Sequence, residues 1–468
     1  MNTQELDRMI EAKMRAAGIG APTVQAFLGA VHKVMAGETG LLPESSIEPI
    51  QSLPNLQEVQ KVRPDGGALR RLAIVKLNGG LGTSMGLERV KSLIPVRGQD
   101  TFLDFIARQI FYLRGGARAA EPAFYLMDSF NTRKDTLDYL RKYPGLGENG
   151  RLDFLQNMVP KIDAQTFEPV SWPEQPELEW CPPGHGDLYP ALSGSGLLDS
   201  LLSRGISYLF VSNADNLGAT VDLNLLEYFA ESGLSFLMEV AQRTASDRKG
   251  GHLTRRRSDG RLALRESAQC PKEDETAFQD IERHRYFNTN NLWVRLDHLK
   301  LELERHGGAL PLALIKNIKN ADPRKPDSPQ VLQLESAMGA AIECFEKAGA
   351  IVVPRIRFSP VKTTSDLLAL RSDVYEVTED FRLTLAEARH GQPPVVNLDA
   401  EYYKLLADFE DCFAQGVPSL LECDSFRTLG RVKFAAGVVC RGKVEFVNPG
   451  AEPRTVPQGN YANVRIEF

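Results

Sequence analysis

The sequence lacks several features that would assign it to a special class of protein. It has no run of 18 consecutive apolar residues, so we expect no membrane-spanning segment and no membrane partner. The N-terminus, MNTQELDRMIEAKMRAAG, carries acidic residues and no apolar core, unlike a secretory signal. Cysteine is scarce, at six in 468 residues, and no pair is spaced CxxC, which argues against a disulfide framework or structural zinc. We therefore expect reduced thiols and a cytoplasmic location.

An excess of positive charge is also missing. Lys and Arg number 55 against 61 Asp and Glu, so the net charge is −6. A dedicated nucleic-acid binder normally shows a basic face, and we therefore expect no nucleic-acid partner. This balance still allows one local cationic pocket for a phosphate ligand.

What the sequence does contain is a composition typical of globular proteins. Hydrophobic residues make up 43% and charged residues 25%, which excludes disorder, collagen and coiled coil as descriptions of the whole chain. A length of 468 residues predicts two to four domains.

The pattern along the chain divides it into three parts. Residues 1–38 show apolar positions at helical spacing, and a polar connector containing proline follows. From residue 70, short apolar runs alternate with amphipathic stretches, which predicts an α/β fold with a parallel sheet covered by helices on both faces. Residues 400–415 resemble one helix, and from Leu429 short strands with Gly and Pro turns predict a small β domain. We predict domains at 1–69, 70–390 and 391–468.

A glycine-rich loop follows the first apolar run of the α/β part. The strand RLAIVKL leads into Asn78 and then GGLGTSMG, ending at Gly86. The spacing fits neither the dinucleotide fingerprint nor the Walker loop. Glycines let the backbone approach an anion, N–H groups at a following helix start point at it, and Lys91 could add a full charge. A tight turn is the alternative, but four glycines and a lysine favour phosphate binding.

Residues at four other positions could take part in binding or catalysis, but each also has an ordinary structural explanation. His185, in PPGHGD, is either a structural histidine or a ligand contact between flexible glycines. Asp215 follows the strand SYLFVSN, where a carboxylate suits Mg²⁺ or caps a turn. The amides of 288–291 suit sugar hydroxyls or an Asn-rich turn. Lys362 is by default a surface lysine.

Several motifs together resemble the eukaryotic-type UTP–glucose-1-phosphate uridylyltransferases. The blocks are LNGGLGTSMG with KSL, MDSFNT, PPGHGD, LFVSNADNLGATVD, MEV, KGG, YFNTNNLW, QLESAMGAA and RFSPVKTTSDLL, between about residues 70 and 375. The resemblance implies a Rossmann-like nucleotidyltransferase domain of the GT-A type at 70–390, with a helical N-terminal segment and a C-terminal domain like a left-handed β-helix. The arginine-containing loop expected of the related N-acetylhexosamine pyrophosphorylases fits less well.

The same resemblance implies roles for individual residues. Nucleotide contacts are implied for Leu77, Asn78, Gly79, Gly80, Leu81, Lys91, Gln156, Gly184, Asp215 and Lys362. Sugar-phosphate contacts are implied for His185, Asn213, Ala214, Gly251, Glu266, Asn288 and Asn290. Lys91 and Lys362 would be catalytic, and Asp215 would be linked to a Mg²⁺ cofactor held largely by the nucleotide.

The implied reaction converts UTP and α-D-glucose 1-phosphate into UDP-glucose and pyrophosphate, by direct in-line displacement without a covalent intermediate. A broad-specificity UDP-sugar pyrophosphorylase is an alternative, as is a catalytically silent nucleotide-sugar binding protein. A homo-oligomer is compatible with the sequence. Two positions depart from the family pattern: Arg89-Val90 replaces the usual Gly-Pro before the loop lysine, and Asp128 stands where the family usually has Asn.

Overall fold

The computed structural model describes residues 2–59, 67–87, 89–115, 121–148, 150–244, 247–322, 325 and 327–468. Residues 60–66 of the predicted connector therefore lie outside the described part. The helices are α1 Thr3–Ala16, α2 Ala21–Met35, α3 Leu56–Val59, α4 Phe102–Gly115, α5 Arg133–Leu140, α6 Leu188–Gly194, α7 Leu197–Ser203, α8 Leu223–Glu231, α9 Glu275–Phe278, α10 Leu296–Arg305, α11 Thr364–Arg371, α12 Ala400–Tyr403 and α13 Leu406–Cys412. None of these helices combines the length and hydropathy needed to cross a membrane.

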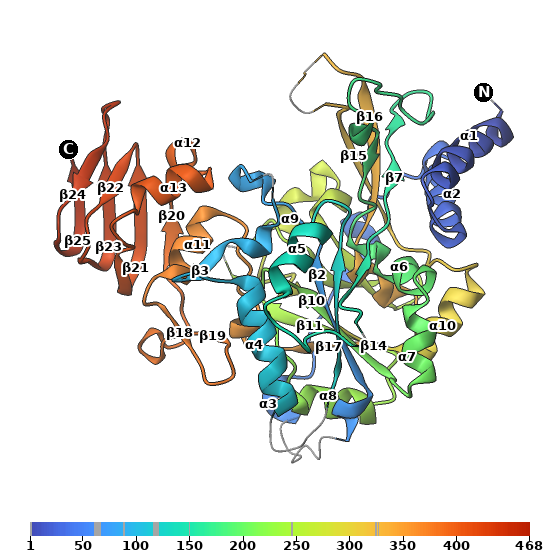
Figure 1. The fold of residues 1–468 in the computed structure, drawn as a ribbon, viewed down its shortest axis with the longest axis horizontal. Helices are drawn as coiled ribbons and strands as arrows, with labels where there is room; N and C mark the ends of the chain where they lie inside the picture. Colours follow the sequence, from blue (N-terminus) through green and yellow to red (C-terminus); the bar gives the residue numbers. More distant parts are fainter. Residues whose placement is uncertain are drawn as a thin grey trace.

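A ten-stranded sheet forms the centre of the molecule (Figure 1). Its strands are β1 Ile47–Pro49, β2 Leu72–Asn78, β5 Ala123–Asp128, β6 Asp153–Leu155, β10 Tyr208–Asn213, β11 Phe236–Gln242, β12 His252–Arg256, β13 Leu262–Arg265, β14 Tyr286–Arg295 and β17 Ala348–Val352. The pairs β10–β2, β2–β5, β5–β6 and β11–β17 are parallel. The predicted parallel sheet is confirmed in part: β14 runs antiparallel between β10 and β11, and β12 is antiparallel to its neighbours.

Helices cover both faces of this sheet, as predicted. Alternate residues of β2 point to opposite sides, since the side-chain period of a strand is two. Leu72 and Ile74 pack in a core with α4 and α8, whereas Ala73 and Val75 pack in another with α6, α7 and α10. Burial on both faces explains why this strand is an unbroken apolar run until Lys76.

The carboxyl ends of the parallel strands meet at one edge. Leu77 is in register with Asn213, and Asn78 is in register with Asp128. The loops that leave β2, β5 and β10 are therefore neighbours, and ligands of open α/β sheets bind at this edge.

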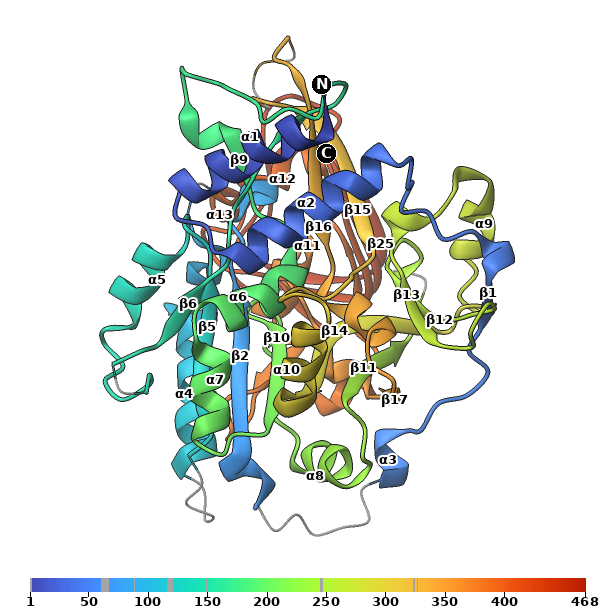
Figure 2. The same cartoon turned by 90° about the vertical axis from the view of Figure 1, so that its right-hand side faces the viewer.

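Smaller elements flank the sheet. They are β3 Pro95–Arg97, β4 Asp100–Thr101, β7 Val159–Pro160, β8 Ile162–Asp163, β9 Trp180–Cys181, β15 Leu314–Asn320, β16 Gln330–Ser336, β18 Tyr375–Val377, β19 Leu383–Leu385, β20 Val395–Asn397, β21 Ser419–Leu429, β22 Val432–Phe434, β23 Val438–Val447, β24 Arg454–Val456 and β25 Gly459–Glu467. The helices α1 and α2 lie against β16 at one end (Figure 2), and β20–β25 stack as parallel strands at the other. The single helix predicted at 400–415 is instead two short helices, α12 and α13.

A buried ion pair joins the central strands to the segment that follows β17. Arg357 donates from Nε and Nη2 to the two carboxylate oxygens of Glu239, at 2.7 Å each. Trp293 Nε1 and Asn291 Nδ2 donate to the same carboxylate at 2.9 and 3.0 Å. Burial disfavours the Arg357 charge, but the Glu239 carboxylate outweighs it and the pKa of Arg357 is raised. Four donors thus satisfy a carboxylate with no solvent exposure.

Truncation of Arg357 tests the importance of this pair. We expect Arg357→Met to lower the free energy of unfolding by about 3–5 kcal/mol, because it leaves the Glu239 carboxylate buried without its cation. The double variant Glu239→Gln/Arg357→Met should recover part of the loss, since a neutral amide still accepts hydrogen bonds from Trp293 and Asn291. Urea unfolding followed by intrinsic fluorescence measures both. A single variant within about 1 kcal/mol of the parent protein would contradict the assignment.

Candidate active site

The glycine-rich loop leaves β2 and folds back on the segment that carries Lys91. The Lys91 N–H donates to the Gly80 carbonyl at 3.2 Å, and Leu81 forms an isolated bridge with Val90. The loop contains a three-residue 3₁₀ turn, Thr83–Met85, and no α-helix begins there, so the predicted helix start at this point is wrong. Val90 is fully buried, which shows that the departure from Gly-Pro is accommodated by packing. The backbone hydrogen bond, rather than a helix terminus, brings Lys91 beside the glycines.

Gly79, Gln156 and Gly184 come together at this loop. A Cβ on Gly79 would lie 2.7 Å from Gln156 Oε1, and Gln156 Nε2 donates to the Gly184 carbonyl at 2.8 Å. Gly184 has a φ of +80°, and a Cβ there would lie 2.4 Å from the Ser336 carbonyl oxygen. Gly184 is therefore required by its φ and by the neighbouring backbone, and the Gln156 amide lies between Gly79 and Gly184.

Lys91, Asp215 and the segment of Lys362 meet at the end of β10. Lys91 Nζ donates to Asp215 Oδ2 at 2.5 Å. The Val361 N–H donates to the Asp215 carbonyl at 3.3 Å, which places Lys362 next in the chain. Asp366 accepts hydrogen bonds from the Lys362 N–H at 2.9 Å and the Thr363 N–H at 2.8 Å, so the start of α11 fixes this backbone. The Lys91 ammonium, the Asp215 carboxylate and the backbone at Lys362, all predicted from sequence, are thus neighbours.

The residues expected at the sugar also form a group. A Cβ on Gly251 would lie 2.4 Å from Glu266 Oε2, so the Glu266 carboxylate packs directly against this glycine. Burial raises the pKa of Glu266, while the positive charge of Lys362 and a hydrogen bond from Asn288 oppose the rise. Electrostatics therefore link this group to Lys362.

An irregularity in β14 presents the amide side chains. Glu239 pairs with Asn291 and Val240 with Asn288, so two residues bulge out between them. Asn290 in this bulge has a φ of +58°, and its Oδ1 accepts from Asn288 Nδ2 at 2.9 Å. Bulges of this kind redirect side chains next to active sites. The amides lie on a strand rather than on the Asn-rich turn that was the alternative.

His185 is a neutral hydrogen-bonding group in this arrangement. Its Nδ1 accepts from the Met338 N–H at 3.0 Å, so the ring proton sits on Nε2. Burial lowers the pKa of His185 to about 4, and the ring stays uncharged at neutral pH. It can donate a hydrogen bond to an anion but is poorly suited to act as a cation.

The remaining predicted residues lie at the same edge of the sheet, and they differ in how deeply their side chains are buried. Asn78 is buried, and its Nδ2 donates to Asp128 Oδ1 at 2.6 Å, so its side chain supports the loop from below. Burial raises the pKa of Asp128 to about 7. Ala214 is buried, and its N–H donates to the Leu77 carbonyl. The side chain of Asn213, at the end of β10, is half-exposed.

Sequence reasoning missed three charged residues beneath the site. Lys76 is buried in β2, where its Nζ donates to Ser212 Oγ at 2.8 Å and to the Ala219 carbonyl at 2.6 Å. Burial, followed by the charge of Arg357, lowers the pKa of Lys76 to about 7. Glu239 and Arg357 are the other two. The available signal was a charged residue inside an apolar run, as in LAIVKL and FLMEV, because such a residue needs a buried partner.

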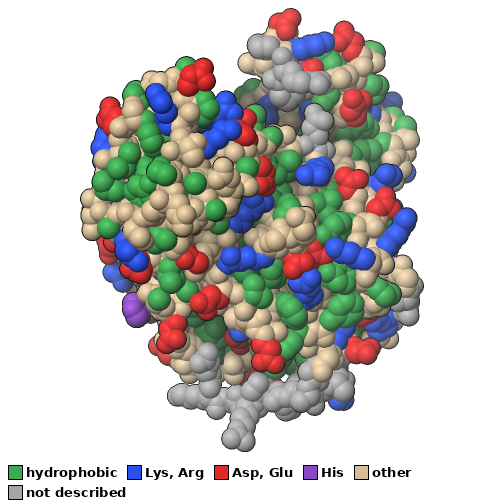
Figure 3. Space-filling model, turned by 60° about the vertical axis from the view of Figure 1, so that its left-hand side comes forward, with side chains coloured by type: hydrophobic (Ala, Val, Ile, Leu, Met, Phe, Trp, Pro, Cys, Tyr) green, Lys and Arg blue, Asp and Glu red, His purple; other side chains and the backbone are tan. Residues whose placement is uncertain are grey.

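The space-filling view shows a notch in the upper edge of the molecule, between two raised lobes, with Lys and Arg side chains close to it (Figure 3). Asp and Glu side chains also lie close to the notch, so both signs of charge are present there (Figure 3).

Comparison with known proteins relates this site to one family. Residues 24–441 match the family model described as UTP--glucose-1-phosphate uridylyltransferase. A protein of that name from Astragalus penduliflorus is 38% identical over 466 residues, covering 97% of this chain and 96% of its own. One from Saccharomyces cerevisiae is 41% identical over 414 residues, covering 87% and 81%.

Solved structures agree. A Leishmania major UDP-glucose pyrophosphorylase in complex with UDP-glucose is 46% identical, with a TM-score of 0.94 and 99% coverage of both chains. A Trypanosoma brucei UDP-glucose phosphorylase is 48% identical, with a TM-score of 0.93 and coverage of 99% and 100%. The family model matches most of the chain and the relatives span nearly all of it, so the chain belongs to the UTP–glucose-1-phosphate uridylyltransferase family.

Proposed function

We propose that the chain converts UTP and α-D-glucose 1-phosphate into UDP-glucose and pyrophosphate by a Mg²⁺-assisted, direct in-line displacement. The activity itself is that of the family to which the chain belongs. The observation that carries the residue assignment is the hydrogen-bonded group of Lys91, Asp215 and Val361 beside the glycine-rich loop, with Lys362 next in the chain.

The nucleophile needs no general base. It is a phosphate oxygen of glucose 1-phosphate, and the second pKa of a phosphate monoester is about 6, so it is largely ionised at neutral pH. The obstacles are repulsion between two anions and the charge that grows on the leaving pyrophosphate. Phosphoryl-type transfers are accelerated mainly by positioning and electrostatic stabilisation. Lysines and a divalent cation therefore supply what this reaction requires.

The two lysines have different tasks. In this proposal Lys91 binds the β- and γ-phosphates of UTP, because it is hydrogen-bonded to the loop that would hold them. Lys362 bridges the attacking phosphate and the α-phosphate. Its electrostatic influence on Glu266 supports this role, since it relates the lysine to the group expected around the sugar. His185 donates to the sugar phosphate from Nε2.

Asp215 fits a magnesium ion that is shared with the nucleotide. Asp215 Oδ2 accepts a hydrogen bond from Lys91 Nζ, while Oδ1 is buried and has no hydrogen-bond partner within the described part of the chain. Among the described residues no group of three or more His, Cys, Asp or Glu side chains could hold a metal alone. Mg²⁺ commonly uses one or two carboxylates together with phosphate oxygens and water. When bound, the ion would neutralise charge on the α-phosphate.

The coarser architecture supports three further parts of the proposal. We assign residues 1–69 to a helical N-terminal segment, 70–390 to the catalytic domain and 391–468 to a C-terminal domain. The parallel pairing of β20, β21, β23 and β25 supports a left-handed β-helix for the last of these. All six cysteines are unpaired thiols, which supports a reducing compartment such as the cytoplasm.

Substitution of the lysines distinguishes their tasks. We expect Lys362→Ala to lower kcat by about 10²-fold or more, because its interaction is strongest as the new bond forms. Lys362→Arg should rescue little, since the guanidinium is planar and wider than an ammonium. Lys91→Ala should raise the KM for UTP more than it lowers kcat. Steady-state kinetics measure these effects, with the exposed Lys443→Ala as the matched control. A normal kcat in Lys362→Ala would remove Lys362 from the catalytic step.

Substitution of Asp215 tests the metal site. We expect Asp215→Asn to raise the Mg²⁺ concentration needed for half-maximal activity by about tenfold or more, because the amide has lost the charge that attracts the ion. A Mg²⁺ titration at saturating UTP measures this shift, and circular dichroism checks the fold. An unchanged Mg²⁺ dependence would show that Asp215 serves only to hold Lys91.

Substitution of Gln156 tests the uracil site. We expect the parent protein to prefer UTP over ATP and GTP by far more than tenfold, because the space between Gly79 and Gly184 is narrow and its amide can pair with a uracil edge. Gln156→Ala should raise the KM for UTP and reduce this preference. Pyrophosphate release with each nucleotide gives the ratio. Turnover of a purine nucleotide within roughly tenfold of UTP in the parent would contradict the proposal.

A further inference from the structure

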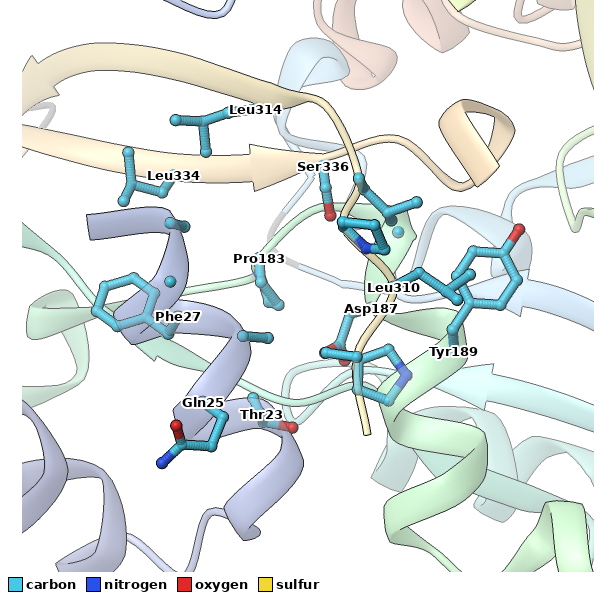
Figure 4. Close-up of a pocket in the computed structure, with 18 of the residues that line it drawn as sticks. Thr23, Gln25, Phe27, Pro183, Asp187, Tyr189, Leu310, Leu314, Leu334 and Ser336 are labelled. Carbon is cyan, nitrogen blue, oxygen red and sulfur yellow. The ribbon is translucent and has the colours of Figure 1, made fainter. Parts of the chain in front are cut away.

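A pocket of about 430 Å³ lies beside the turn that carries Gly184 and His185, and Pro183, Gly186 and Asp187 of that turn line it (Figure 4). Helix α2 forms one wall, the chain leading into β15 and the end of β16 form another, and the start of α6 closes the back. Sites for small organic ligands have volumes of about 300–1,000 Å³. The pocket is large enough for one such molecule and separate from the glycine-rich loop.

The walls of this pocket are mainly apolar. Phe27, Leu310, Leu314 and Leu334 contribute hydrophobic side chains. Tyr189 presents its ring, because its hydroxyl is directed to the Met338 carbonyl, to which it donates at 2.7 Å. A ligand would therefore meet flat or branched hydrocarbon over most of its surface, which favours an aromatic molecule.

Polar groups at the pocket favour a single negative charge on that molecule. Lys33 lines the pocket from α2, and within the described residues it has no carboxylate within 4.0 Å. The carboxylate of Glu335, also in the lining, accepts a hydrogen bond from Asn317 Nδ2 at 3.0 Å, and Asp187 is occupied by Asn157. Both carboxylates of the lining are thus engaged by hydrogen bonds, and Lys33 is the Lys or Arg side chain of the lining that can pair with an anion.

One wall of the pocket is directly connected to the nucleotide site. Ser336 lines the pocket, and its N–H donates to the Pro183 carbonyl at 3.0 Å. Its carbonyl oxygen occupies the space where Gly184 would carry a Cβ. On the opposite side, Gln156 donates to the Gly184 carbonyl. We call the residues Pro183, Gly184 and Ser336 the clasp, because they separate the pocket from the nucleotide site.

We propose that this pocket is a second, regulatory ligand site for a small aromatic monoanion, and that a ligand bound there weakens UTP binding. The inference rests on the proposed placement of uracil beside Gln156. In the present structure Gln156 Nε2 donates to the Gly184 carbonyl, so the clasp holds the amide that would face uracil. A ligand that fills the pocket presses on Ser336, displaces the tightly packed clasp and so moves that amide away from the position in which it would pair with uracil. By linkage, UTP weakens the pocket ligand by the same factor.

The aromatic sulfonate 1-anilinonaphthalene-8-sulfonate (ANS) is a suitable probe, because it is apolar, carries one negative charge and fluoresces when bound. We expect the folded full-length protein to bind one molecule per chain. Ala30→Trp, which fills the pocket from α2, and Lys33→Glu, which reverses its charge, should each weaken ANS by about tenfold or more. Met35→Trp and Arg8→Glu are matched controls on exposed positions outside the lining. Lys33→Glu leaves the packing intact if Ala30→Trp does not fold.

Calorimetric titration of UTP at increasing ANS concentrations tests the coupling. The expected result is a rise in the UTP Kd of about fivefold or more that reaches a plateau, and an equal rise in the ANS Kd at saturating UTP. A rise without a plateau would mean that ANS occupies the nucleotide site, which overturns the proposal. Unchanged ANS affinity in both pocket variants, or an unchanged UTP Kd, also overturns it. Failure of the proposed function is distinguishable from failure of this proposal, because the protein would then release no pyrophosphate from UTP and glucose 1-phosphate even without ANS.

Discussion

The ion pair between Glu239 and Arg357 is the interaction on which the geometry of the active site depends. Arg357 also donates to the Thr220 carbonyl at 2.9 Å, and its own carbonyl accepts from Asn216 Nδ2 at 3.0 Å. The same pair therefore fixes the loop after β10, which carries Asp215, and the chain leading to Lys362. On its other side Glu239 holds Asn291, next to the bulge of β14. One desolvated charge pair thus connects the loop that carries Asp215 to the strand that carries the amide cluster.

Opposite charges keep the site ordered until substrates arrive. An unpaired lysine near buried groups is costly, and the hydrogen bond between Lys91 and Asp215 removes much of that cost. A nucleotide with its metal brings both a new anion for Lys91 and a new cation for Asp215. The proposed substrates therefore replace this internal pair with two external ones, and neither side chain is left alone. In the proposed mechanism, Lys91 exchanges Asp215 for a phosphate of the nucleotide, and Asp215 exchanges Lys91 for the metal ion.

The sequence was most informative where polar residues or glycines follow a buried apolar strand. The ends of β2 and β10 could be predicted because an apolar run stops at each and polar or glycine residues follow, which singled out the glycine-rich loop and Asp215. The antiparallel insertion of β14 could not be predicted, because its apolar residues fit either strand direction. The bulge at Asn290 and the partners of Lys76 depend on contacts between distant segments. No local pattern encodes those contacts, although a charge inside an apolar strand signals that a partner exists.

The clasp explains why so small a turn needs two glycines. Gly184 adopts a backbone conformation that side chains rarely allow, and a Cβ on Gly186 would lie 2.3 Å from Ser336 Oγ. The turn is therefore pressed between the end of β16 on one side and Gln156 on the other. A segment packed this closely moves as a unit with its neighbours, because interiors transmit displacement rather than absorb it. Helix α2 lines the same pocket as Ser336, so the N-terminal helices are separated from the Gln156 amide by the pocket and the backbone of the clasp.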